Sequence, residues 1–162
     1  MLAAAALLLA GVLAFGAIRI LEPDGLPRID EDAVGLIDPD SGRITAQYPV
    51  GHGPQAVAAG AGSVWVANQQ DRTVSRIDRD REEVVTIDVG GAPSGLAFGA
   101  SSLWVADGQG RETAQIAPQT NKVGQRIEVG NAAHAVVAGY GAVWVASAVD
   151  ATVVRIDVAS GT

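Results

Sequence analysis

Three six-residue stretches of the sequence decide the fold: SVWVAN at 63–68, SLWVAD at 102–107 and AVWVAS at 142–147. The first two Trp residues are 39 positions apart, and the second and third are 40 positions apart. Val-Gly pairs recur at the same two intervals, beginning at Val50, Val89 and Val129. Self-similarity sustained at a period of about 40 residues is typical of a repeat protein.

Each repeat contains four short strand-like runs, which in the first complete repeat are 56–60, 64–68, 74–78 and 84–89. The first run consists of small residues, which suits the innermost strand of sheets that converge on an axis. The second run is apolar on both faces, as expected for a strand covered by a neighbouring sheet on each side. The fourth run alternates apolar and polar residues, which is typical of a half-solvated outer edge. Four-stranded antiparallel sheets repeated around an axis form a β-propeller.

Two acidic segments lie between the third and fourth runs, DPDSG at 38–42 and DRDRE at 78–82. They lack the spacing and the closing Glu of an EF-hand calcium loop. The sequence therefore predicts tight turns in which Asp38 or Asp78 caps the chain reversal with a side-chain hydrogen bond.

The longer segments VGHGPQAVAAGAGSVWVANQQDRTVSRID (50–78) and VGGAPSGLAFGASSLWVAD (89–107) resemble the YVTN-type β-propeller repeats. More distantly, they are similar to the repeats of the streptogramin lyase family. The resemblance covers residues 34–162 and implies a propeller that closes, in complete family members, with about seven blades. It leaves function open, because such repeats occur in binding, sensing and enzymatic proteins.

The repeats predict a half blade at 34–50, complete blades at 55–89 and 95–129, and a partial blade at 135–162. The expected fold class is thus all-β, a partial β-propeller of about three four-stranded antiparallel blades forming an open arc. Closed propellers need about four to eight blades, so we expect the chain to be a fragment of a longer protein. Assembly of several short chains into one ring is the alternative.

One N-terminal transmembrane helix is expected before the propeller. Residues 1–21 carry no side-chain charge before Arg19, and as a helix they would be about as long as a bilayer core is thick. They predict a membrane anchor or uncleaved signal, with a cleaved signal peptide and a buried core helix as alternatives. The Pro- and acid-rich residues 22–33 are interpreted as a linker. We expect the propeller outside the cytoplasm, at the cell surface or in the periplasm. Arg19 and Arg28 counted alone would give the opposite orientation, unless a basic segment precedes Met1.

The composition excludes several kinds of site. The chain has no Cys, so a disulfide, a thiol nucleophile and a thiolate metal site are impossible. Its net charge of −7, with no basic cluster, argues against a nucleic-acid partner. No metal-ligand spacing, nucleophile elbow or catalytic set is recognisable, so no catalytic residue, metal site or cofactor is predicted.

Candidate binding residues lie on one rim of the predicted propeller, which we call the upper rim. It consists of the loops between the second and third strands of each repeat and the loops that lead into the next repeat. Asp71, Glu112 and Asp150 lie on these loops, and the predicted binding residues are His52, Asn68, Arg72, Asp107, Arg111 and His134. The expected partner is an unknown small molecule or protein. The three Trp residues, Trp65, Trp104 and Trp144, are expected to pack blade against blade rather than to stack on a carbohydrate or a base.

These observations favour a membrane-anchored, non-enzymatic module that binds a ligand or protein, or acts as a sensor, on its upper rim. One alternative is a lyase like the streptogramin lyases, in which His52, His134 and Glu112 would help to hold a divalent ion and abstract a proton. Another is the sensor portion of a larger signalling or transport-associated protein.

Overall fold

The computed structural model describes residues 28–158. These residues contain thirteen strands and no helix, and therefore no helix that could cross a membrane is found in this part of the chain. The predicted anchor at 1–21, the first half of the predicted linker (22–27) and the last four residues lie outside the described residues. The chain divides into two compact units, of which the described parts are 28–30 with 35–47, and 31–34 with 48–158.

The first unit is built on a hairpin. Strand β1 (Ala33–Ile37) pairs with β2 (Ile44–Pro49) in a two-stranded sheet. The first two residues of β1 and the last two of β2, at the ends away from the turn, belong to the second unit. The turn between them is capped as predicted: Asp38 Oδ1 accepts hydrogen bonds from the Ser41 amide at 2.7 Å and the Asp40 amide at 3.1 Å. The bond from the Ser41 amide is the main reason why the pKa of Asp38 lies below its ordinary value.

The second unit contains three antiparallel sheets, two with four strands and one with three. The strands run in chain order within each sheet. The first sheet holds β3 (Pro54–Gly60), β4 (Ser63–Asn68), β5 (Thr73–Asp78) and β6 (Glu83–Asp88). The second holds β7 (Pro93–Gly99), β8 (Ser102–Asp107), β9 (Glu112–Ala117) and β10 (Lys122–Glu128). The third holds β11 (Ala133–Gly139), β12 (Ala142–Ser147) and β13 (Thr152–Asp157). The four-stranded sheets agree with the predicted blades.

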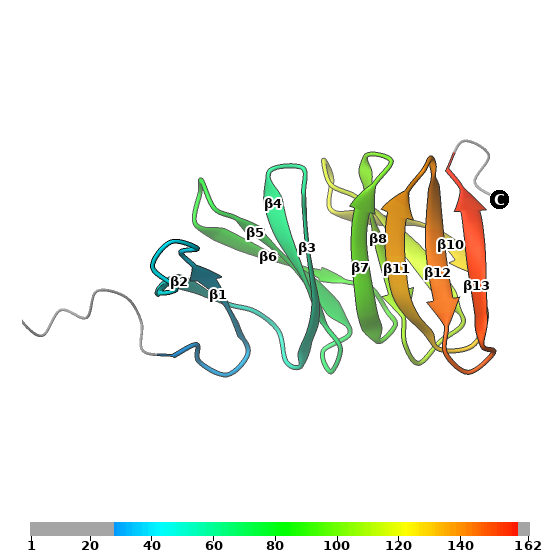
Figure 1. Cartoon of the computed structure of the whole chain (residues 1–162), viewed down its shortest axis with the longest axis horizontal. Helices are drawn as coiled ribbons and strands as arrows, with labels where there is room; N and C mark the ends of the chain where they lie inside the picture. The colour runs from blue at the N-terminus through cyan, green and yellow to red at the C-terminus, as the bar shows by residue number, and fades with distance from the viewer. Residues whose placement is uncertain (1–27, 159–162) are drawn as a thin grey trace, which may run out of the picture. The chain divides into compact units, whose positions relative to one another are not determined.

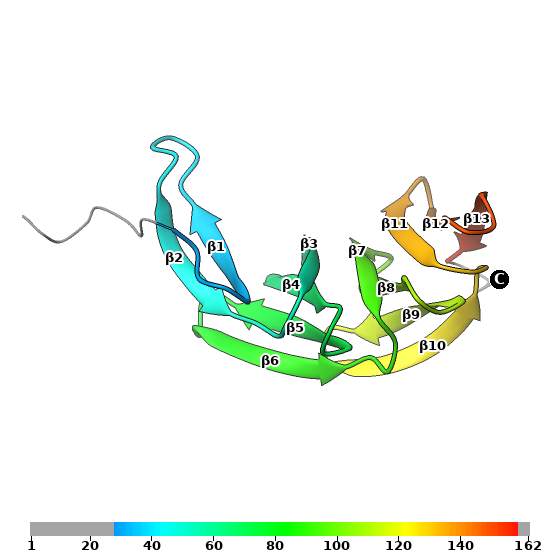
Figure 2. The same ribbon diagram turned by 90° about the horizontal axis from the view of Figure 1, so that it is seen from below.

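The three sheets lie side by side and approach most closely at their first strands, where β7 packs against both β3 and β11 (Figure 1). Seen from below, β3, β7 and β11 lie on one side of these sheets and β6 and β10 on the other (Figure 2). Small residues allow this approach, because a Cβ at Gly60 would meet the ring of Phe98 and one at Gly99 would meet Ala138. The small residues of the first run are therefore explained by the distance between neighbouring sheets.

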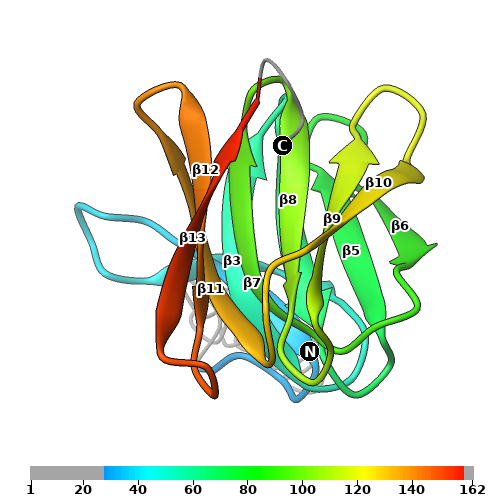
Figure 3. The ribbon, with the colours of Figure 1, turned by 90° about the vertical axis from the view of Figure 1, so that its right-hand side faces the viewer.

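Each Trp residue lies on the second strand of its sheet, β4, β8 or β12, and its burial shows how the sheets pack. Figure 3 shows the ribbons of β8 and β12. Trp65 is fully buried in a cluster that contains Leu103 and Ile116 of the second sheet. Trp104 is 3% exposed and packs with the third sheet in the same way. Trp144 is only partly buried, because it lies on the face of the third sheet that points away from the second. Trp65 and Trp104 are therefore buried between neighbouring sheets, whereas Trp144 is not.

The fourth strands form the outer edges of their sheets, as the sequence predicts. Ile87 and Val89 are buried, while Asp88 between them is exposed. The cap predicted for the turn between β5 and β6 is also present, because Asp78 Oδ1 accepts hydrogen bonds from the amides of Asp80 and Arg81 at 3.1 and 3.2 Å.

Candidate functional site

Backbone hydrogen bonds join the loops of the upper rim. The loop that leads into each sheet binds the loop between the second and third strands of the same sheet, as in Gly108 N–H to Ala92 O at 2.9 Å. Val89 N–H donates to Arg72 O at 3.1 Å and Val129 N–H donates to Arg111 O at 2.8 Å, which extends the β5–β6 and β9–β10 pairing to the start of the loop into the next sheet. The second and third sheets are connected by Ala132 N–H, which donates to Gly110 O at 2.9 Å. The rim therefore holds loops from all three sheets in fixed positions.

Carboxylates add a second set of bonds between the same loops. Asp71 Oδ2 accepts the His52 backbone N–H at 2.8 Å, and Asp150 Oδ2 accepts the Asn131 backbone N–H at the same distance. The backbone bond from His52 is the main reason why the pKa of Asp71 is lowered. For Asp150, the bond from the Asn131 side chain has this role. Both acids occupy the same place in the repeat and are held ionised by the loops that they join.

The middle repeat forms this link from a different position. Gly110 stands where the other repeats have Asp71 and Asp150, and the acid is instead Asp107, at the end of β8. Asp107 Oδ1 accepts the backbone N–H groups of Ala92 at 3.0 Å and Gly110 at 2.9 Å. A Cβ at Gly110 or at Gly91 would collide with the other oxygen of this carboxylate. Gly91, Gly110 and Asp107 therefore belong together: the two glycines leave room for the Asp107 carboxylate, which makes the link that Asp71 and Asp150 make in the other repeats.

His52 lies between two carboxylates. Its Nδ1 is 3.0 Å from Asp71 Oδ2, and its Nε2 is 3.7 Å from Asp32 Oδ2. The hydrogen bond with Asp71, followed by the charges of Asp71 and Asp32, raises the pKa of His52 above its ordinary value. The imidazole remains 69% exposed, so this pair fixes the loop at the surface of the rim.

Three other predicted binding residues, Asn68, Arg111 and Asp107, form hydrogen bonds or ion pairs within the protein. Asn68 is fully buried rather than exposed on the rim, and its Nδ2 donates to Thr73 Oγ1 at 3.0 Å and Ser75 Oγ at 2.9 Å. Arg111 forms an ion pair with Glu128 at 2.9 Å, and Asp107 joins loops as described above. These side chains stabilise the rim.

Arg72 and His134 differ from the rest. Both are exposed, and within residues 28–158 neither side chain has a hydrogen bond or an ion pair. His134 is the extra residue of a β-bulge, since the pairing of β11 with β12 shifts between Ala133 and Ala135. The other two first strands have the same bulge at Gln55 and Ser94, which the sequence alone did not indicate.

The residues of the lyase alternative are not gathered at one point. His52 pairs with Asp71, and Glu112 lies 3.7 Å from Arg126 in an ion pair. In the part of the chain that the structure describes, no group of three or more His, Asp and Glu side chains is arranged to hold a metal ion.

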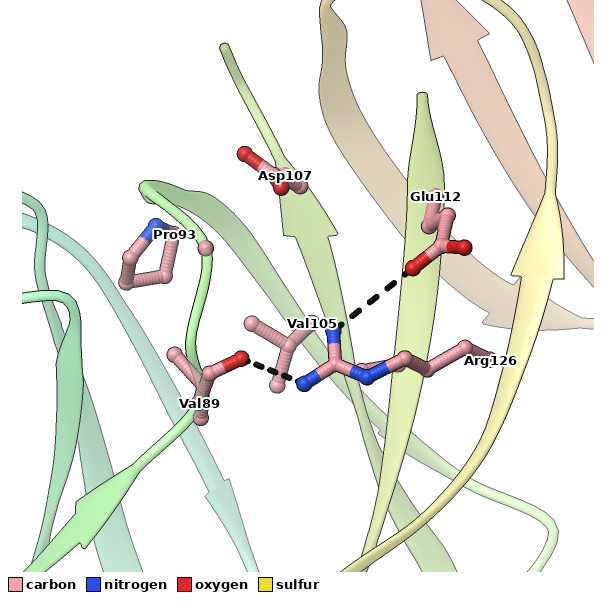
Figure 4. A pocket seen from close by; sticks show the side chains of 8 residues that line it. Val89, Pro93, Val105, Asp107, Glu112 and Arg126 are labelled. Atoms are coloured by element: carbon pink, nitrogen blue, oxygen red, sulfur yellow. Dashed lines mark hydrogen bonds and ion pairs between the residues drawn. The ribbon is translucent and has the colours of Figure 1, made fainter. Parts of the chain in front are cut away.

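Two hollows lie on the rim of the second sheet. The outer one, which we call the rim groove, has a volume of about 230 Å³ and is lined by Arg72, Gly90, Gly91, Ala92, Asp107, Gln109 and Gly110. A smaller, mostly apolar hollow shares Gly91 and Asp107 with it (Figure 4). In this smaller hollow, Arg126 donates a hydrogen bond to Val89 O at 2.6 Å, and Glu112 compensates its charge in an ion pair. The sequence did not indicate the rim groove, because three of its seven lining residues are glycines, which have no side chain to mark a site.

No family model matches the chain, and no curated protein matches its sequence. Solved structures do match. Hydrazine synthase of Kuenenia stuttgartiensis matches with 20% identity and a TM-score of 0.73, over 80% of this chain and 41% of that one. Virginiamycin B lyase from Staphylococcus aureus matches with 16% identity and a TM-score of 0.60, over 76% of this chain and 48% of that one. The structure of a nidogen/laminin complex matches with 15% identity and a TM-score of 0.65, over 81% of this chain and 53% of that one.

The chain thus spans about half, or less, of the length of these structures. Their identities are low, so the likeness concerns the fold alone. The β-propellers among the matches, the lyase and the nidogen complex included, agree with the packed four-stranded sheets of residues 54–128. The packed antiparallel sheets of residues 54–157 are consistent with a β-propeller fold.

Proposed function

We propose that the chain belongs to a binding or sensor module that takes a ligand or a protein on its upper rim. The observation that carries this proposal is the contrast within the rim. Most of its charged side chains are used to fix the loops, whereas Arg72 and His134 project from those fixed loops without a partner among the described residues. A braced surface with free polar side chains suits binding, because little conformational freedom is lost when a partner is bound.

The proposal includes the finer interpretations of the sequence. These are membership of the YVTN-type repeats, a propeller spanning 34–162 that further blades would complete, a linker at 22–33, and an anchor at 1–21. They also include exposure of the propeller outside the cytoplasm. Protease digestion of intact cells tests this last point: an extracytoplasmic propeller is cleaved without lysis, and a cytoplasmic one is not.

Site-specific photo-crosslinking tests the binding function. A photoreactive residue replaces Gln70 or Gln109 on the upper rim, and in matched controls it replaces Asp80 or Thr120 in the turns at the other end of the sheets. We expect one specific cross-linked partner from the rim positions and none from the turn positions. Cross-links from the turns alone would contradict the proposal. Cross-links from neither end would exclude a protein partner and limit the rim to a small ligand.

The lyase alternative is favoured by one observation, the likeness to virginiamycin B lyase. Its test is the metal-dependent consumption of virginiamycin B by the protein. Loss of that activity in His52→Ala or His134→Ala would then assign a role to the histidine concerned. The alternative of a sensor portion in a larger signalling or transport-associated protein shares the binding rim and is tested by the same cross-links.

A further inference from the structure

The rim groove contains an arginine whose charge is not compensated. The backbone of Arg72 is fixed, since its carbonyl accepts Val89 N–H at 3.1 Å, while its guanidinium has no hydrogen bond or ion pair within residues 28–158. The nearby acids have other donors: Asp71 binds His52, and Asp107 Oδ1 binds backbone amides. The chain has a net charge of −7, but the acids on this part of the rim bind other groups and do not pair with Arg72.

The same groove also contains a carboxylate oxygen that is free to accept. All three described hydrogen bonds of the Asp107 carboxylate, from Ala92, Gln109 and Gly110, go to Oδ1. No group among the described residues donates to Oδ2, which lies against Gly91 and Gly110 in the groove lining. Figure 4 shows the Asp107 carboxylate apart from the Arg126–Glu112 pair, so that pair does not neutralise it.

The shape of the groove is particular to the middle repeat. Gly91 and Gly110 stand at the positions of His52 and Asp71 in the first repeat, and of Asn131 and Asp150 in the third. Without these side chains, a ligand can approach the backbone closely. The volume of about 230 Å³ suits a molecule smaller than a typical drug-sized ligand.

We propose that the rim groove binds a small zwitterion of the α-amino-acid class. The ligand's carboxylate pairs with the Arg72 guanidinium, and its ammonium group donates to Asp107 Oδ2. The pairing selects for both charges together: a simple anion is repelled by Asp107, and a simple cation is repelled by Arg72. The proposal rests on the binding function proposed above and names the class of ligand for that rim.

Calorimetric titration of the full 162-residue chain in a mild detergent tests the proposal, with glycine, acetate and methylammonium as probes. We expect glycine to bind at least about tenfold more tightly than either single-charge probe, because a hydrogen bond between charged groups contributes about that factor. Arg72→Gln and Asp107→Asn should each weaken glycine binding by a similar factor. Asp107→Asn keeps an Oδ1 acceptor for the loop amides, and it should strengthen acetate binding because the repulsion is removed.

The matched control is Arg79→Gln, which removes an exposed arginine from the turn at the other end of β5 and should leave glycine binding unchanged. Thermal unfolding of each variant checks that the fold is retained. Absence of glycine binding, equal binding of acetate and glycine, or glycine binding that is insensitive to Arg72→Gln would each overturn the proposal. Rim-specific cross-links obtained together with such a result would leave the binding function standing and refute only the zwitterion.

Discussion

Trp65 and Trp144 occupy the same place in the repeat, but only Trp65 is fully buried. Trp65→Ala should therefore lower the free energy of unfolding by about 3–5 kcal/mol, as expected when a large aromatic side chain leaves a cavity. Trp144→Ala should cost less, about 1–2 kcal/mol, because less apolar surface is lost. Urea unfolding of the full chain measures both values, and equal losses would show that the two Trp environments do not differ.

His52 titrates between two acids, and this predicts a pH dependence. Its folded-state pKa is raised above the ordinary value of 6.5 by the hydrogen bond and charge of Asp71, and by the charge of Asp32. The stability that protonated His52 contributes is therefore fully present below pH 6.5 and is lost as the pH rises through the raised pKa. NMR titration of the imidazole should give a raised pKa that falls toward 6.5 in Asp71→Asn. An unchanged pKa in that variant would contradict the pairing.

The acid that links the rim loops stands at a different position in the second repeat than in the first, at Asp107 rather than at the position of Asp71. This difference can be tested by moving the acid back to position 110. Gly110→Asp alone should destabilise the second sheet, because its side chain would meet the Asp107 carboxylate. Gly110→Asp combined with Asp107→Asn recreates the Asn68 and Asp71 pattern of the first repeat and should recover much of the loss. A double variant with additive losses, measured by thermal unfolding, would refute this interpretation.

The strands could be predicted from the sequence because the repeat places each residue type at a fixed distance from the axis. Small residues at 56–60 mark the close approach of first strands, and apolar residues on both faces mark the second strands. The partial exposure of Trp144 could not be predicted from its own repeat, because burial depends on the sheet that follows. The bulges at Gln55, Ser94 and His134 were missed because a bulge changes the pairing of a strand without changing its composition.

The site was less predictable than the strands. A polar residue in a loop position can bind a partner, as proposed for Arg72, or bind the protein itself, as Arg111 does in its ion pair with Glu128. Sequence position does not distinguish these uses, because the choice depends on which donors and acceptors lie nearby. Asn68 illustrates this: at the end of β4 it is fully buried, with Thr73 and Ser75 as its acceptors.

At the scale of the whole molecule, the account depends on one arrangement, in which the first and the second sheet each bury their Trp against the sheet that follows. Trp65 packs with Leu103 and Ile116, and Trp104 packs with Val143 and Ile156. The same arrangement brings the loops of neighbouring sheets together, so the rim and its groove exist only if the sheets pack in this order.

Nuclear Overhauser measurements on the methyl-labelled full chain test this arrangement most directly. The account predicts cross-peaks from the Trp65 indole to the methyl groups of Leu103 and Ile116, and from the Trp104 indole to those of Val143 and Ile156. Indole cross-peaks confined to residues of the same sheet would contradict the packed blades and, with them, the rim.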